Sequence, residues 1–193
     1  MIINDQKVYD GSFIHKRFAY KYFRDKTLAV GNIVSFIAPV EVTLNLIDLE
    51  DSLEKDYIYS DSMVNFCWEI PNLDPFGAVC FQRLFNTNIA NILHNIIKKP
   101  IQMKGDDIIV HAEHDQGGIV QQKGKSSVSI TYSKDNVAIG HTGINITAGK
   151  RAPAFAYSTN LTPEQAVQFQ NEVINLYYGM VDNIFVATSK VIV

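Results

Sequence analysis

The chain has 193 residues, of which 47% are hydrophobic and 19% are charged, and its formal net charge is −3. This balance is typical of a globular protein and excludes a disordered chain, and the length suits one domain, expected over residues 1–193. Lysine and arginine are dispersed, and the densest groups are only Lys98-Lys99 and the pair Lys123 and Lys125. We therefore expect no direct nucleic-acid binding, which needs a concentrated basic face.

The N-terminus and the cysteine content point to the cell interior. The sequence MIINDQKVYDGS has no cationic start followed by an apolar core, and no apolar run is long enough to span a membrane. Cys67 and Cys80 are too few for a disulfide framework, so we expect reduced thiols. The sequence therefore predicts a cytoplasmic protein without membrane contact.

The first half of the chain predicts one helix and three strands. Asp10-Gly11-Ser12 signals a turn. The helix after it carries an apolar stripe of Phe13, Ile14, Phe18, Tyr22 and Phe23. Strands are expected over 33–37 and 40–49, separated at Pro39, with an acidic connection over 50–54. Residues 57–70 alternate as a strand, with Ile58, Val64, Phe66 and Trp68 on one face and Asn65, Cys67 and Glu69 on the other. That polar face either meets solvent or lines a pocket.

The second half predicts two long helices around further strands. Asp74 as N-cap and Pro75 at the first helical position start a helix that Pro100 ends. Its stripe is Phe81, Phe85, Ile89, Ile92 and Ile96. Strands are expected over 108–110, 127–132 and 140–147. The capping box Thr162-Pro163-Glu164-Gln165 opens a last helix, whose inner stripe is Val173, Tyr177, Met180 and Ile184. The order of elements predicts an α+β fold, with helices packed on a mostly antiparallel sheet.

Two acidic motifs are candidates for chemistry. In Asp48-Leu49-Glu50-Asp51, Asp48 and Glu50 would share a strand face, a spacing suited to a cation site or an acid–base pair, although an acidic loop end gives the same pattern. In Lys104-Gly105-Asp106-Asp107, a tight turn explains the aspartates as well as catalysis does.

Two strand motifs carry more chemical content. Lys125 follows Gly124 at the mouth of a strand with Ser127 and Ser129, where a lysine can meet a carboxylate or a phosphate. A solvated hairpin lysine would look the same. In the motif His141-Thr142-Gly143-Ile144-Asn145-Ile146, alternate residues His141, Gly143 and Asn145 share one face, and the glycine leaves space for a ligand or a closely packed backbone.

Metal and thiol chemistry have weaker support. In His111-Ala112-Glu113-His114-Asp115, His111 and Glu113 would share a strand face while His114 points away, so no metal site is expected. Cys67 would act as a nucleophile only beside a base, and buried cysteines are usually inert.

The order of these motifs resembles an uncharacterised archaeal and viral family, domain of unknown function 366. The resemblance rests on the segments 105–110, 124–130 and 141–146, and on the shorter motifs 48–51, Asn65-Phe66 with Glu69, and Gln82-Arg83. The segment from His111 to Gln122 is longer than the corresponding link in the family.

A weaker resemblance is to the catalytic domain of biotin and lipoate protein ligases, which implies a fold of that type. In those enzymes a lysine contacts the substrate carboxylate or acyl phosphate. The resemblance implies this role for Lys125 and for no other residue of this chain. The Arg/Gly-rich loop that holds ATP has no counterpart, because residues 49–56 are acidic and lack glycine. We therefore expect no adenylation and no cofactor. Ligase-like sheets often pair, so a homodimer is an expectation.

These resemblances leave three hypotheses for a protein with a small-molecule substrate or ligand. The first is ATP-independent chemistry on a carboxylate-bearing heterocycle, such as decarboxylation of 7-carboxy-7-deazaguanine, a compound of virus-encoded DNA-modification pathways; a viral protein would then work in the host cytoplasm. The second is acyl transfer of the octanoyl type through a thioester on Cys67 or Cys80. The third is ligand binding without turnover.

The expected catalytic residues are Lys125, Glu69, Asp106, Asp107 and His141. The expected substrate-binding residues are Asn65, Cys67, Arg83, Ser127, Ser129, Gly143 and Asn145.

Overall fold

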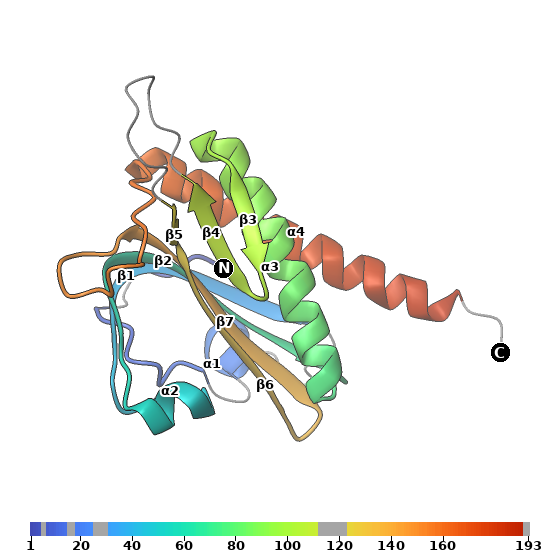
Figure 1. Ribbon diagram of the computed structural model, residues 1–193. Helices are drawn as coiled ribbons and strands as arrows, with labels where there is room; N and C mark the ends of the chain where they lie inside the picture. Colours follow the sequence, from blue (N-terminus) through green and yellow to red (C-terminus); the bar gives the residue numbers. More distant parts are fainter. Residues whose placement is uncertain (5–6, 15–17, 25–30, 112–122, 191–193) are drawn as a thin grey trace.

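A four-stranded antiparallel sheet forms the centre of the molecule in the computed structural model, which describes residues 1–4, 7–14, 18–24, 31–111 and 123–190 (Figure 1). Its order is β1-β2-β7-β6, from β1 (Asn32–Val42), β2 (Ile58–Pro71), β6 (Ser127–Lys134) and β7 (Val137–Thr147). A second antiparallel sheet has the order β3-β4-β5, from β3 (Ile101–Lys104), β4 (Asp107–His111) and β5 (Lys123–Lys125). The predicted α+β class with mostly antiparallel pairing is confirmed.

Two long helices cover one face of the larger sheet (Figure 1). In α3 (Pro75–Ile97) Asp74 accepts a hydrogen bond from the Gly77 amide, and in α4 (Pro163–Ser189) Thr162 and Gln165 form a complete capping box. Both helix starts therefore follow the local signals in the sequence. Trp68 and Phe66 of β2 pack against this layer, and both are fully buried. No helix in the described part of the chain is both long and apolar enough to cross a membrane.

The N-terminal segment covers the other face. It adds to the edge of β1, where the Tyr9 amide donates to the Pro39 carbonyl at 2.9 Å. Of the predicted stripe, Phe13, Ile14 and Phe18 are buried in a second core, and Tyr22 and Phe23 are partly buried against it. However, the helix α1 covers only Phe18–Phe23, and Phe13 lies in a turn before it.

Because of this cover, the polar face of β2 does not meet solvent. Asn65, Cys67 and Glu69 are fully buried. Ile58 belongs to the same second core, on the face opposite to the predicted one. The reason is a register shift between Ser62 and Met63, which turns the start of β2 over relative to the rest of the strand.

The prediction of a strand over 40–49 is correct only for residues 40–42, and the predicted break at Pro39 is wrong. β1 continues through Pro39 to Val42, and Pro39 is accommodated on an edge strand at a register shift between Ala38 and Val40. Residues 49–54 then form the short helix α2 (Leu49–Glu54) where an irregular connection was expected. Asp48 caps it by accepting from the amide of Glu50 at 2.8 Å. Local capping therefore prevails over the strand-like alternation of this segment.

The predicted inner stripe of the last helix is correct only at its start. Val173 and Tyr177 are fully buried, but Ile184 is 37% exposed. Figure 1 shows the reason, because the C-terminal end of α4 extends past the edge of the sheet.

Candidate functional site

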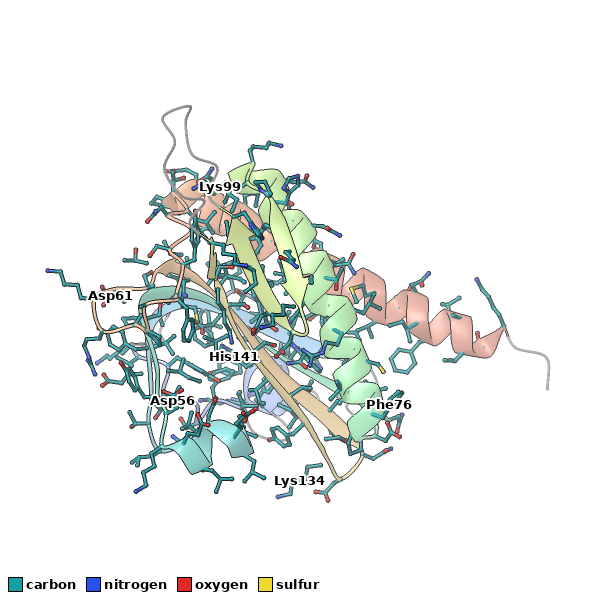
Figure 2. All side chains as sticks on the ribbon, in the orientation of Figure 1. Asp56, Asp61, Phe76, Lys99, Lys134 and His141 are labelled. Atoms are coloured by element: carbon teal, nitrogen blue, oxygen red, sulfur yellow. The ribbon has the colours of Figure 1, made fainter. Side chains whose placement is uncertain are left out.

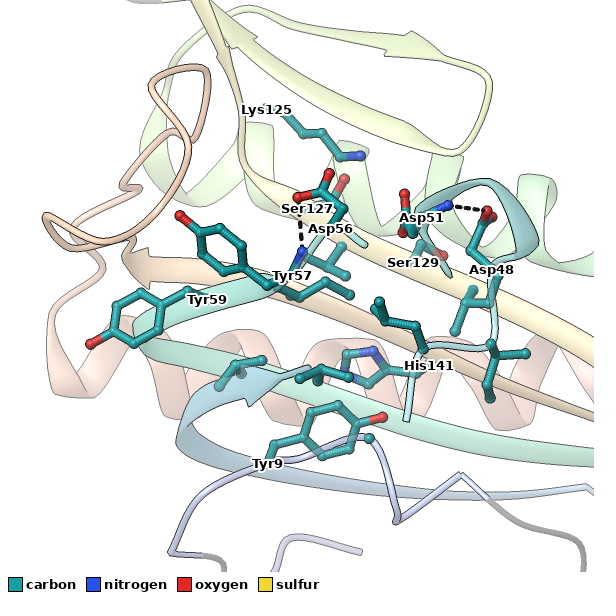
Figure 3. Close-up of a pocket in the computed structure, with 18 of the residues that line it drawn as sticks. Tyr9, Asp48, Asp51, Asp56, Tyr57, Tyr59, Lys125, Ser127, Ser129 and His141 are labelled. Atoms are coloured by element: carbon teal, nitrogen blue, oxygen red, sulfur yellow. Dashed lines mark hydrogen bonds between the residues drawn. The ribbon is translucent and has the colours of Figure 1, made fainter. Parts of the chain in front are cut away.

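A cavity of about 250 Å³ opens at the junction of the two sheets (Figure 3). Strands β6 and β7 supply its floor, the N-terminal segment closes one end, and the region of α2 and the segment 153–156 form its rim. The charged residues that line it are one lysine, Lys125, and five aspartates, Asp48, Asp51, Asp56, Asp106 and Asp107. Such a lining repels a triphosphate.

Lys125 is held in place on both its backbone and its side chain. Its amide donates to the Phe155 carbonyl and its carbonyl accepts from the Tyr157 amide, both at 2.8 Å. Its Nζ lies 2.7 Å from Asp107 Oδ1. The preceding Gly124 permits this arrangement, because a Cβ there would lie 2.9 Å from the Phe155 carbonyl oxygen. The lysine is therefore a preorganised cation on the cavity wall.

Ser126 joins the two sheets at this point, since β5 ends at Lys125 and β6 begins at Ser127. The Ser126 hydroxyl donates to the Ile108 carbonyl at 3.0 Å, and the Ser127 hydroxyl accepts from the Ile108 amide at 2.9 Å. The Ser126 carbonyl accepts from the amide of Asn145 on β7 at 2.8 Å. These bonds fix the angle at which Lys125 approaches the floor.

A polar network ties the aspartate pair to helix α3. Asp106 forms an ion pair with Arg83, and Gln82 Nε2 donates to Asp106 at 3.3 Å and to the Ser129 hydroxyl at 2.8 Å. Asn86 Nδ2 donates to the Asp106 carbonyl at 3.0 Å. Arg83 and Asp106 are thus part of the framework that holds the β3–β4 turn, and with it Asp107 beside Lys125.

His141 lies near the centre of the molecule and is only 2% exposed (Figure 2). Asn65 Nδ2 donates to the Met63 carbonyl, so Asn65 Oδ1 accepts, at 2.9 Å, a hydrogen bond from His141 Nε2. This arrangement leaves Nδ1 of the neutral imidazole as an acceptor. Tyr9 stacks on the ring with a centroid separation of 4.5 Å. Burial lowers the pKa of His141 from 6.5 to about 3, so the imidazole is uncharged near neutral pH.

The acidic rim differs from its prediction. Asp48 and Glu50 do not share a strand face, because Asp48 caps α2 and Glu50 is exposed to solvent. Asp48 and Asp51 of this motif both line the cavity (Figure 3); because Asp48 caps the helix, the carboxylate of the motif that has no capping role is that of Asp51. Its pKa is raised by burial first and then by the nearby charges of Asp48 and Asp56.

The structure brings together seven of the predicted site residues. These line the cavity: Lys125, Asp106, Asp107, Ser127, Ser129, His141 and Asn145. The other five are not among its lining residues. Asn65 and Arg83 hold lining residues from behind, Gly143 packs against Met63 and His141, and Glu69 and Cys67 are buried within the sheet.

Several lining residues were not predicted. Asp51 was part of a recognised motif but was assigned to an acidic connection, and Asp56 and Tyr57 follow it in the sequence. Tyr9 carried no signal, because it reaches the cavity only through the pairing of the N-terminal segment with β1.

The histidine-rich segment gives no metal site within the described ranges. His111 is partly buried beside Gln102, with His111 Nε2 at 3.3 Å from Gln102 Oε1. Glu113 and His114 lie outside the described residues. In the described ranges no group of three histidine, cysteine or acidic side chains is placed to hold a metal ion.

Comparison with known structures confirms the predicted ligase-like fold. A protein of unknown function from Pyrococcus horikoshi superposes with a TM-score of 0.81 and 22% identity, over 100% of this chain and 97% of that one. The P. falciparum LipL1 in complex with lipoate has a TM-score of 0.56 and 13% identity, over 93% of this chain and 60% of that one. The biotin protein ligase from Aquifex aeolicus in complex with biotin and ATP has a TM-score of 0.51 and 12% identity, over 90% of this chain and 68% of that one.

Comparison of the sequence is decisive for the family. No curated protein matches it. A single family model spans residues 1–192, nearly the whole chain. The chain therefore belongs to the family described as domain of unknown function DUF366.

Proposed function

We propose that this protein is an ATP-independent decarboxylase of a small heterocycle that carries a carboxylate, with 7-carboxy-7-deazaguanine as the candidate substrate. The observation that carries the proposal is the Lys125–Asp107 ion pair, 2.7 Å long, in a cavity otherwise lined by acidic side chains. The single lysine can bind the substrate carboxylate, and the surrounding aspartates favour its loss as uncharged CO₂.

The size and lining of the cavity support a ring as the ligand. Its volume of about 250 Å³ is below the usual range of about 300–1,000 Å³ for drug-sized ligands, which favours a free heterocycle over a nucleotide. Tyr57 and Phe155 at the rim offer aromatic faces for stacking on a planar ring. Similar folds hold lipoate in one relative and biotin with ATP in another. The acidic rim argues against triphosphate binding here.

The proposed reaction uses the Lys125–Asp107 pair in two ways. Asp107 repels the substrate carboxylate, and this repulsion disappears when the bond between the ring carbon and the carboxyl carbon breaks and CO₂ leaves. The electron pair stays on the ring carbon, which takes a proton from the Lys125 ammonium group. Lys125 then regains a proton from water. Neutral His141 binds the ring as a hydrogen-bond acceptor and does not donate the proton.

The test is decarboxylation of carboxyl-¹³C-labelled 7-carboxy-7-deazaguanine in D₂O. We expect release of ¹³CO₂ and one deuterium on the ring carbon that carried the carboxylate. Lys125→Met should abolish both signals. Lys123→Met is the matched control, because Lys123 lies on the same strand but is exposed and does not line the cavity. Full turnover by Lys125→Met would refute the proposed role of the lysine.

The same assay separates acyl transfer from decarboxylation. Cys67 is fully buried, burial raises its pKa, and it is not among the cavity-lining residues, whereas Cys80 lies on α3 at a different groove. Cys67→Ser should therefore keep full activity. Loss of activity in this variant, together with an acyl adduct on the wild-type thiol by mass spectrometry, would favour the transferase. Ligand binding without turnover would leave a binding protein.

A further inference from the structure

Two polar groups in the cavity wall have no hydrogen-bond partner among the residues that the structure describes. Asn145 is 3% exposed and Tyr9 is 2% exposed, and both line the cavity. Neither Asn145 Oδ1 nor the Tyr9 hydroxyl has a hydrogen-bond partner in the described ranges. Buried polar atoms are almost always paired, so unpaired ones in a cavity wall indicate groups that a ligand satisfies.

Asp51 adds a partly buried carboxylate at the rim of the same cavity. Its carboxylate lies on the cavity rim between Asp48 and Asp56, and no hydrogen bond or ion pair engages it in the part of the chain described here. Burial, Asp48 and Asp56 raise its pKa, and the Lys125 ammonium group offsets only part of this effect. A ligand that donated hydrogen bonds there would relieve this cost.

The lining as a whole therefore demands a ligand rich in donors. His141 adds an acceptor, because its Nε2–H is committed to Asn65. Lys125 is the only cation among the lining residues described and is already paired with Asp107. In Figure 3 Lys125 and Tyr9 lie at opposite ends of the cavity, and Asp51 lies on the rim between them. A ring that contacts Lys125 and extends toward Tyr9 would therefore lie beside Asp51.

We propose that the substrate ring carries an amino group beside a ring N–H, and that the Asp51 carboxylate binds these two adjacent donors while Asn145 Oδ1 and the Tyr9 hydroxyl pair with other polar groups of the ring. Two parallel N–H donors match the two oxygens of one carboxylate. The inference rests on the proposed function, because it describes the ring of the same substrate. It adds that the protein selects amino-substituted rings over rings with a bare carbon at that position.

The test is calorimetric binding of two rings that lack a carboxylate, 7-deazaguanine and 7-deazahypoxanthine, which differ by the amino group. We expect the wild-type protein to bind the amino-substituted ring about 10-fold or more tightly, as hydrogen bonds to a charged group allow. Asp51→Asn should remove most of that preference. Glu50→Gln is the matched control, since Glu50 lies on the same helix but is exposed and outside the cavity lining. Circular dichroism confirms that each variant is folded.

The outcomes distinguish this inference from the decarboxylase proposal. A preference for the amino-substituted ring that Asp51→Asn abolishes and Glu50→Gln retains supports the inference, even if the carboxylated ring is never turned over. Equal binding of the two rings to the wild-type protein, a preference unchanged in Asp51→Asn, or no binding of either ring overturns it. Decarboxylation combined with equal binding would overturn this inference alone.

Discussion

Removal of His141 should make the stability of the protein less sensitive to acid. Burial lowers the pKa of this imidazole from 6.5 to about 3 in the folded state. As the pH falls below 6.5, the His141 imidazole becomes protonated in the unfolded chain but stays neutral in the folded one. The stability that depends on the neutral form is therefore complete above pH 6.5 and is lost as the pH falls toward about 3.

The size of the effect follows from the two pKa values. Each pH unit between them changes the free energy of unfolding by about 1.4 kcal/mol, so the full contribution is about 5 kcal/mol. At pH 4.5, about half of it should be lost. We expect a His141→Gln variant to be less stable at pH 7.5, because the contacts with Asn65 and Tyr9 change, but to lack this component of the acid dependence.

Urea unfolding between pH 7.5 and 4.5 measures this contribution. Trp68 is the single tryptophan and is fully buried, so its fluorescence reports global unfolding. Carboxylates such as Asp51 titrate in both proteins and cancel when the two pH profiles are subtracted. His94→Gln replaces an exposed histidine and controls for loss of an imidazole. Parallel profiles for wild type and His141→Gln would refute the reasoning.

Three further substitutions test the packing and the helix caps, with stability measured by urea unfolding in each case. Gly140→Ala should destabilise the protein by about 3 kcal/mol or more, because its Cβ meets the rigid, buried ring of Trp68. Gly143→Ala on the same strand should cost less, about 1 kcal/mol, because it meets the flexible end of Met63; equal costs would show that the neighbour does not decide the outcome. Thr162→Ala should cost about 1 kcal/mol through loss of the capping box on α4, and an unchanged midpoint would contradict this.

Sequence signals that act locally predicted the fold well. The start of α3 at Asp74-Pro75 and the start of α4 at Thr162 match the structure, because an N-cap is decided by residues within one turn. The short strands β3 and β5 were missed, since four and three residues carry too little alternation to recognise. Asp48 was misassigned because its capping bond competes with an alternation that looks like a strand.

The candidate site was predictable only where it depends on a single strand. Alternation placed His141 and Asn145 on one face of β7, and the structure confirms that both line the cavity. The position of Tyr9 depends on pairing between the N-terminal segment and β1, which no local pattern reveals. The burial of Glu69 has the same origin, because the segment that covers the polar face of β2 is distant in the sequence.

The way in which Ser126 links the two sheets has a mechanical consequence. The lysine belongs to the small sheet and the floor of the cavity belongs to the large one, and along the chain one residue separates them. A change in the angle between the two sheets at Ser126 would therefore move the Lys125 ammonium group relative to the cavity floor. Substitutions in β3, which contributes no cavity-lining residue, should therefore change the reach of Lys125 without altering any residue that lines the cavity.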